Sequence, residues 1–107
     1  MPRYRMIIHG RNFHLNIDGR CQKVGFRTPR YADGPDPVKA VRTALDAFRW
    51  SQKYVTMMRA ALNSRTDQAI LSAEEVEETS PDARFECGLP GLVFYREEAP
   101  VRSESTA

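Results

Sequence analysis

The sequence predicts one α+β domain, in which helical structure covers one face of a mainly antiparallel sheet. Two alternating segments at the start of the chain flank an Asp18-Gly19 pair, which is typical of a β-hairpin. An amphipathic stretch follows from residue 37, and two further apolar stretches near the C-terminus predict two more strands. A hairpin, a helical region and then further strands are the order expected of an α+β fold.

The first hairpin strand contains a change of parity. Apolar residues fall on even numbers up to Ile8 and on odd numbers from Phe13 onward, so the strand needs one extra residue. Gly10-Arg11-Asn12 is the natural place for it, because Gly and Asn tolerate positive φ. The pattern leaves open one bulged strand or two short ones. The return strand is expected over about residues 22–31, with Pro29 near an edge or a strand end.

The helical region begins with a strong start signal. Asp36 suits the N-cap and Pro37 the first helical position. An apolar stripe follows at spacings of three and four, formed by Val38, Val41, Leu45 and Phe48. One helix over residues 37–62 would be about 40 Å long. Because the residues from Trp50 to Lys53 interrupt the stripe, we expect two helices or a kinked helix, and a single rod remains the alternative.

The C-terminal part is expected to add two strands to the hairpin. A strand over about residues 68–78 is weakened by its glutamates, and Leu92 to Tyr95 read as a short buried strand. The pattern leaves open whether another strand begins at Phe85. We place the domain over residues 1–99 and expect the polar residues 100–107 to be a disordered tail.

The net charge of +2 conceals two oppositely charged halves. Residues 1–65 carry a net charge of +9 and residues 66–107 a net charge of −7. Such asymmetry indicates either a charged binding surface or two halves that neutralise each other across neighbouring strands. We favour mutual neutralisation.

The chain resembles an ordinary cytoplasmic protein in composition. Charged residues make up 28%, no apolar run is long enough to span a bilayer, and the first residues lack the apolar core of a signal peptide. Cys21 and Cys87 are expected to be reduced thiols, with Cys87 partly buried, although a disulfide remains open if their strands pair.

Three sets of residues could carry chemistry, and we expect none of them to be catalytic, metal-binding or cofactor-binding. His9 and His14 fall on opposite faces of a regular strand, unless a bulge brings them together, and they lack a third ligand. Cys21 has cationic neighbours but lies beside a turn, where residues are mostly solvated. The carboxylates of Glu74 to Glu78 scatter over both faces of their strand, so they read as electrostatic partners of the basic half.

Two surfaces are candidates for binding. A basic hairpin face could contact phosphates of RNA or DNA, and it would comprise Arg3, Arg5, Arg11, Lys23 and Arg27. The aromatic residues interleaved with it, including Tyr31, have the parity of core residues. The helical segment beyond residue 49 offers a second surface, to which Trp50, Tyr54, Met57 and Met58 contribute apolar area.

Several segments of the first half resemble known small proteins. These segments are residues 4–13, residues 25–32 and the helix start from Asp36 to Val41. They resemble small stand-alone bacterial proteins without assigned activity, and the strand–strand–helix order is similar to HicB-type antitoxin domains. That resemblance implies a bacterial origin and an mRNA-cleaving toxin as partner. The chain departs from the antitoxin pattern in its basic second strand and in having no DNA-binding tail motif.

The sequence therefore predicts a cytoplasmic, non-enzymatic protein-interaction module that pairs with another protein or with itself as a homodimer. The expected surface is the sheet edge or the segment from Trp50 to Leu62. An RNA- or DNA-binding protein that uses the basic hairpin is the alternative. An enzyme ranks third, because no nucleophile, base and orienting group can be named together.

Overall fold

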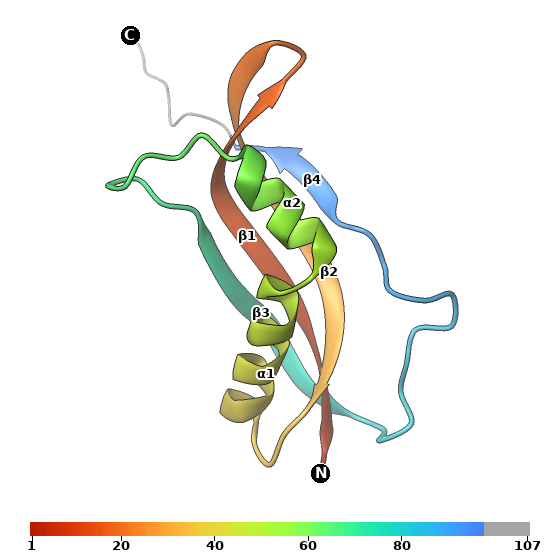
Figure 1. The fold of residues 1–107 in the computed structure, drawn as a ribbon. Coiled ribbons are helices and arrows are strands. Elements are labelled where there is room, and N and C mark those ends of the chain that lie inside the picture. The colour runs from red at the N-terminus through yellow and green to blue at the C-terminus, as the bar shows by residue number, and fades with distance from the viewer. Residues whose placement is uncertain (98–107) are drawn as a thin grey trace, which may run out of the picture.

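The computed structural model describes residues 1–97, which form a four-stranded antiparallel sheet with two helices on one face (Figure 1). The elements in chain order are β1 (Arg3–Ile17), β2 (Arg20–Asp33), α1 (Pro37–Arg49), α2 (Gln52–Ala60), β3 (Ile70–Thr79) and β4 (Val93–Arg96). The strand order is β3-β1-β2-β4, so the hairpin occupies the centre and the two C-terminal strands add to its sides. The α+β prediction is confirmed, and the expected tail over residues 100–107 lies outside the described residues.

The parity change in the first strand is a bulge within one continuous strand. The pairing of β1 with β2 shifts register between Gly10 and Phe13, and Asn12 has a φ of 61°. The hairpin turn is also as predicted, since Asp18 and Gly19 have φ values of 54° and 82°. Two successive positive φ angles match the twist of the flanking strands.

The helical region divides into two helices at the predicted interruption. The Asp36 side chain accepts a hydrogen bond from the Lys39 backbone amide, and Pro37 opens α1. Trp50 ends α1, and the Ser51 hydroxyl caps α2 by accepting from the Tyr54 amide. The predicted stripe was shifted at its start, because α1 buries Ala40, Ala44 and Phe48, whereas Val38 is 71% exposed.

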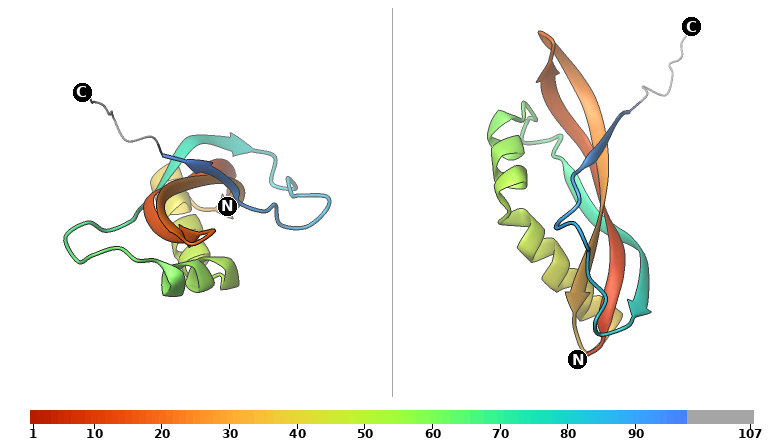
Figure 2. Two further views of the ribbon diagram at one scale, coloured as in Figure 1. Left: turned by 90° about the horizontal axis from the view of Figure 1, so that it is seen from above. Right: turned by 90° about the vertical axis from the view of Figure 1, so that its right-hand side faces the viewer.

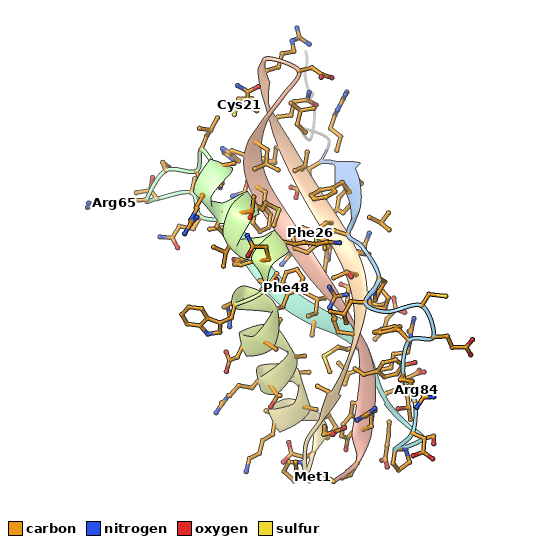
Figure 3. The ribbon with its side chains drawn as sticks, turned by 45° about the vertical axis from the view of Figure 1, so that its right-hand side comes forward. Met1, Cys21, Phe26, Phe48, Arg65 and Arg84 are labelled. Carbon is orange, nitrogen blue, oxygen red and sulfur yellow. The ribbon has the colours of Figure 1, made fainter. Side chains whose placement is uncertain are left out.

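The core lies between the helices and one face of the sheet. Its largest fully buried side chains are Phe13, Phe26, Met6 and Ile8. Phe26 stacks at centroid distances of 5.4 Å from Phe13 and 5.6 Å from Phe48, which lies across from it on α1 (Figure 3). The prediction that Tyr31 belongs to this core is wrong. Tyr31 is half-buried and packs against Phe85 at 4.6 Å.

Residues 80–92 form a long loop that carries the chain from one side of the sheet to the other (Figure 1). No strand therefore begins at Phe85 within the described residues. The Arg3 guanidinium holds the start of the loop by donating to the Ala83 carbonyl at 2.7 Å. Because β4 pairs only with Val24 to Arg27, β2 is an edge strand from Thr28 onward, and Pro29 falls there as expected.

The molecule is elongated, with extents of 51 × 27 × 27 Å, and the tip of the β1–β2 hairpin projects at one end (Figure 2). None of the helices in the described part of the chain is long and apolar enough to cross a membrane.

Candidate interaction surface

The β4 side of the sheet presents an apolar edge. Val93 is 70% exposed and Phe94 is 51% exposed, and Leu89 in the preceding loop is exposed as well. No residue from Gly88 to Tyr95 carries a charge. An exposed apolar edge without charges is a template for pairing with another strand, and the short length of β4 limits the area that can pair.

The free hydrogen-bonding groups of this edge follow from its register. The Glu97 amide donates to the Lys23 carbonyl at 3.0 Å, and bonded and non-bonded pairs alternate along an antiparallel ladder. Tyr95 and Val93 therefore bond to β2, because they lie two and four residues away from Glu97. The N–H and C=O groups of Phe94 and of its alternate neighbours point away from the sheet, where a further strand can reach them.

A groove lies between this edge and α2. It encloses about 500 Å³ and is lined by Gln52, Lys53, Thr56, Met57, Gly91, Leu92 and Phe94. Phe94 reaches the core side of the sheet, where its ring is 5.9 Å from that of Phe26. The groove thus continues the apolar edge onto the helix-covered face.

The opposite edge, β3, carries charges and an irregularity. Four of its residues are glutamates, and the pairing with β1 shifts register between Arg5 and Ile7. Glu75 within this bulge has a φ of 54° and is exposed. Charged side chains and bulges are devices that prevent edge-to-edge pairing.

A polar cluster on the open face of the sheet joins all four strands. His9 of β1 lies with its Nδ1 3.2 Å from the Glu74 carboxylate on β3 and its Nε2 beside the Tyr95 hydroxyl on β4. Arg27 of β2 contacts the same carboxylate at 3.2 Å and lies 5.3 Å from the Tyr95 ring centroid. Since a carboxylate only accepts, Nδ1–H donates to Glu74 and Nε2 accepts from the Tyr95 O–H.

Packing and charge hold this cluster in place. The Tyr95 ring covers Gly25, where a Cβ atom would lie only 2.4 Å from the ring. The pKa of Glu74 is lowered, first by the hydrogen bond from Arg27 and then by that from His9, against the opposing effect of burial. His9 is only 7% exposed and both of its ring nitrogens are engaged. The cluster therefore fastens β4 and β3 to the central hairpin.

The structure separates the four predicted interface residues of the helical segment. Trp50 is 83% exposed and Met58 is exposed on the surface of α2. Tyr54 instead packs against Phe48 at 5.4 Å, and Met57 is buried in the core while also lining the groove. Sequence spacing alone did not distinguish these directions.

The predicted basic face is divided by acidic partners. Arg3 forms a bidentate ion pair with Asp33, and Arg27 pairs with Glu74. Arg5 lies directly opposite Glu77 in the β1–β3 register. Arg11 and Lys23, the other two predicted residues, are exposed and form no ion pair within residues 1–97.

The histidines and cysteines occupy separate places. His14 lies 3.2 Å from Asp67, away from the cluster around His9, and no metal-holding group of three ligands occurs in residues 1–97. Cys21 and Cys87 are both free and exposed, so they are not joined by a disulfide, and the expected partial burial of Cys87 is wrong.

Sequence reasoning missed the role of Tyr95 and the link between His9 and Glu74. Glu74 lies 65 residues and Tyr95 lies 86 residues after His9, and the strand order brings all three together. The prediction of a strand near residues 92–95 is confirmed by β4, but the prediction that this strand is buried is wrong, because β4 lies at the edge of the sheet and leaves Val93 and Phe94 exposed.

Comparison of the chain with family models, with curated proteins and with solved structures finds no match. The resemblance to HicB-type antitoxins therefore stays a prediction.

Proposed function

We propose that the protein is a non-enzymatic interaction module that forms a homodimer through antiparallel pairing of β4 with the β4 strand of a second copy. The observation that carries the proposal is the uncharged, exposed edge from Leu92 to Tyr95, whose outward backbone groups have no partner strand in the described chain. A binding role is also supported by His9, because it is buried and both ring nitrogens are engaged, which leaves none for a substrate proton.

The register of the strands supports a second copy of the chain as the partner that pairs with β4. Pairing through the outward groups of Phe94 places this residue opposite itself, and it places Val93 opposite Tyr95 of the second copy. Aromatic and β-branched residues form favourable cross-strand pairs, and this register sets no like charges opposite each other. Antiparallel pairing of β3 with the β3 strand of a second copy would instead bring glutamates close to one another.

Closure of the assembly at two copies follows from the difference between the edges. A two-fold β4 contact consumes the apolar edge of both copies and makes β3 the outermost strand at each end of the extended sheet. Because those ends carry glutamates and a bulge, further addition is disfavoured. The four-residue length of β4 predicts a small interface and a weak, concentration-dependent dimer.

Two exposed free thiols support a cytoplasmic location, since thiols are kept reduced in that compartment.

The test compares two valines of equal exposure. Val93→Asp places a carboxylate on the paired edge, where Arg27 lies opposite in β2 and helps to keep the monomer folded. Val38→Asp is the matched control, because Val38 is 71% exposed against 70% for Val93 and lies in the first turn of α1, where an acid is tolerated.

Sedimentation velocity over a wide range of concentration is the measurement. The wild-type chain and Val38→Asp should show a monomer–dimer equilibrium, and Val93→Asp should weaken it at least tenfold. A wild-type chain that stays monomeric up to its solubility limit contradicts the proposal, as does a Val93→Asp variant that dimerises like the wild type.

A further inference from the structure

The end of the hairpin forms a two-stranded arm. Pairing of β3 with β1 ends at Arg11, and pairing of β4 with β2 ends at Val24. Between these positions, over residues 12–23, β1 and β2 form ladder pairs only with each other. Figures 1 and 2 show the outer end of this twisted ribbon projecting beyond the helices and the two outer strands. The base of the ribbon stays in the body, because Phe13 is buried in the core and the His14 carbonyl accepts the Leu62 amide at 2.7 Å.

Three cations surround a hollow at the arm. Arg20 and Lys23 on β2 and Arg96 on β4 line a space of about 380 Å³, together with Cys21, Gln22 and Glu97. All three cations are exposed, and none forms an ion pair within residues 1–97. The carboxylate of Glu97 is engaged, because it accepts the Asn12 backbone amide at 2.6 Å.

The cations of the arm differ from two arginines elsewhere in the hairpin, which have acidic partners. Lower in the sheet, Arg3 and Arg27 each have a carboxylate partner within 3.2 Å. The acidic residues of β3 cannot compensate the arm in the same way, since their strand does not extend alongside it. Within the described residues, Arg20, Lys23 and Arg96 at the arm are therefore without a carboxylate partner, whereas Arg3 and Arg27 in the body of the hairpin are paired.

We propose that this arm binds double-stranded DNA, with Arg20, Lys23 and Arg96 contacting backbone phosphates. The major groove of B-form DNA is about 12 Å wide and admits a two-stranded β-ribbon. Arginine and lysine side chains on such a ribbon neutralise phosphates and release counterions, which supplies sequence-independent affinity. The hollow between the three cations is open and polar, as a phosphate-contacting surface requires.

The site differs from the basic face predicted from the sequence. Lys23 is retained, whereas Arg3 and Arg27 are excluded by their acidic partners. Arg20 and Arg96 are added because the fold brings the end of β4 beside the base of the arm. The proposal does not depend on dimerisation through β4.

The test is fluorescence polarisation of a labelled 20-base-pair duplex in a titration with the full chain. Three phosphate contacts predict a slope of about −2.7 in a plot of log affinity against log salt, or about 40-fold weaker binding at roughly 200 mM than at roughly 50 mM salt. Arg20→Gln, Lys23→Gln and Arg96→Gln should each reduce the slope by about 0.9. Arg42→Gln is the matched control, because Arg42 is exposed on α1 and forms no ion pair in the described chain.

Several results overturn the proposal. These are the absence of binding at low salt, a triple variant that binds the duplex like the wild type, and an equal loss of affinity in Arg42→Gln. Equal affinity for a heparin fragment of the same charge also overturns it, because the site would then be a general polyanion surface. Circular dichroism confirms that each variant is folded, and Val93→Asp should bind through its arm with an unchanged salt slope.

Discussion

The two edge strands of the sheet, β3 and β4, both leave backbone hydrogen-bonding groups exposed, but they differ in length and in charge. β3 is ten residues long, and it presents glutamates and a bulged register to solvent. β4 is four residues long and presents Val93 and Phe94, and its one charged residue is Arg96 at its C-terminal end. A long edge offers more backbone groups for unwanted pairing, so it needs protection by charge, whereas a short edge can remain apolar. This difference is the reason why we propose β4 rather than β3 as the edge that associates.

Both edges are nevertheless fastened by one cluster. His9 contacts Glu74 on β3 and Tyr95 on β4, so each edge strand is bound to the central hairpin through the same imidazole. Changes to the cluster should therefore show which edge depends on it more. The short β4 has fewer ladder bonds of its own, and we expect it to respond first.

The largest effect is expected from Gly25→Ala. The new Cβ would lie 2.4 Å from the Tyr95 ring and 2.8 Å from the Gly10 carbonyl oxygen, so both the ring and the backbone must shift. Overpacking of this kind costs about 1–3 kcal/mol in the free energy of unfolding, which denaturant titration measures.

The matched control for this substitution is Gly91→Ala. The nearest atom to a Cβ at Gly91 is the Lys53 Nζ at 3.7 Å, which is an ordinary contact. This variant should unfold like the wild type. Equal stability of Gly25→Ala and the wild type would show that Tyr95 does not pack against β2 as described.

A smaller effect is expected from Tyr95→Phe. The substitution removes the hydroxyl that donates to His9 Nε2 and leaves a buried acceptor unpaired, which costs about 1–2 kcal/mol. Hydrogen exchange should show faster exchange of β4 amides and unchanged protection in β3. Equal acceleration in both strands would contradict the view that His9 fastens the two edges separately.

The effect of Glu74→Gln should depend on pH. Because Arg27 and then His9 hold the pKa of Glu74 below its ordinary value of 4.5, the carboxylate stabilises the fold above that value. This contribution is lost as the pH falls through the lowered pKa. Glu74 is 37% exposed, so screening limits the difference from the wild type to under about 1 kcal/mol.

Denaturant titrations of the wild type and Glu74→Gln at neutral and acidic pH measure this difference. The difference should be present at neutral pH and shrink as the pH falls below 4.5 through the lowered pKa of Glu74. A difference that persists in acid would assign the effect of the substitution to packing rather than to charge. Asp33, whose pKa is lowered by Arg3, titrates in both proteins and therefore cancels in the comparison.

The elements with local signals were predictable, and the cluster was not. The Asp18-Gly19 turn, the bulge near Gly10 and the Asp36 cap depend on residues close in sequence, and each was found where the pattern placed it. The strand order depends on long-range pairing. The sequence therefore could not reveal that Tyr95 meets His9, or that the end of β4 lies beside Lys23.

The burial of Val38 and Tyr31 was predicted wrongly because it depends on how their elements pack in the fold. Val38 matches the predicted stripe, but α1 buries the face formed by Ala40, Ala44 and Phe48, and Val38 lies on another side of the helix, so its side chain meets solvent. Tyr31 lies five residues after Phe26 in the regularly paired part of β2, so the two side chains point to opposite faces of the sheet. Its register partner is Arg5, a residue of the open face.

The smallest change in stability is expected from Glu77→Val, which tests whether charge protects the β3 edge. Glu77 is exposed opposite Arg5, so the loss of one cross-strand pair should change the free energy of unfolding by no more than about 0.5 kcal/mol. Association should change more, because an apolar β3 edge would let dimers add to one another into larger species. Glu86→Val removes the same charge from the 80–92 loop, and sedimentation should show it to be unaltered. If Glu77→Val also remains a dimer, the bulge at Glu75 rather than the charge keeps this edge unpaired.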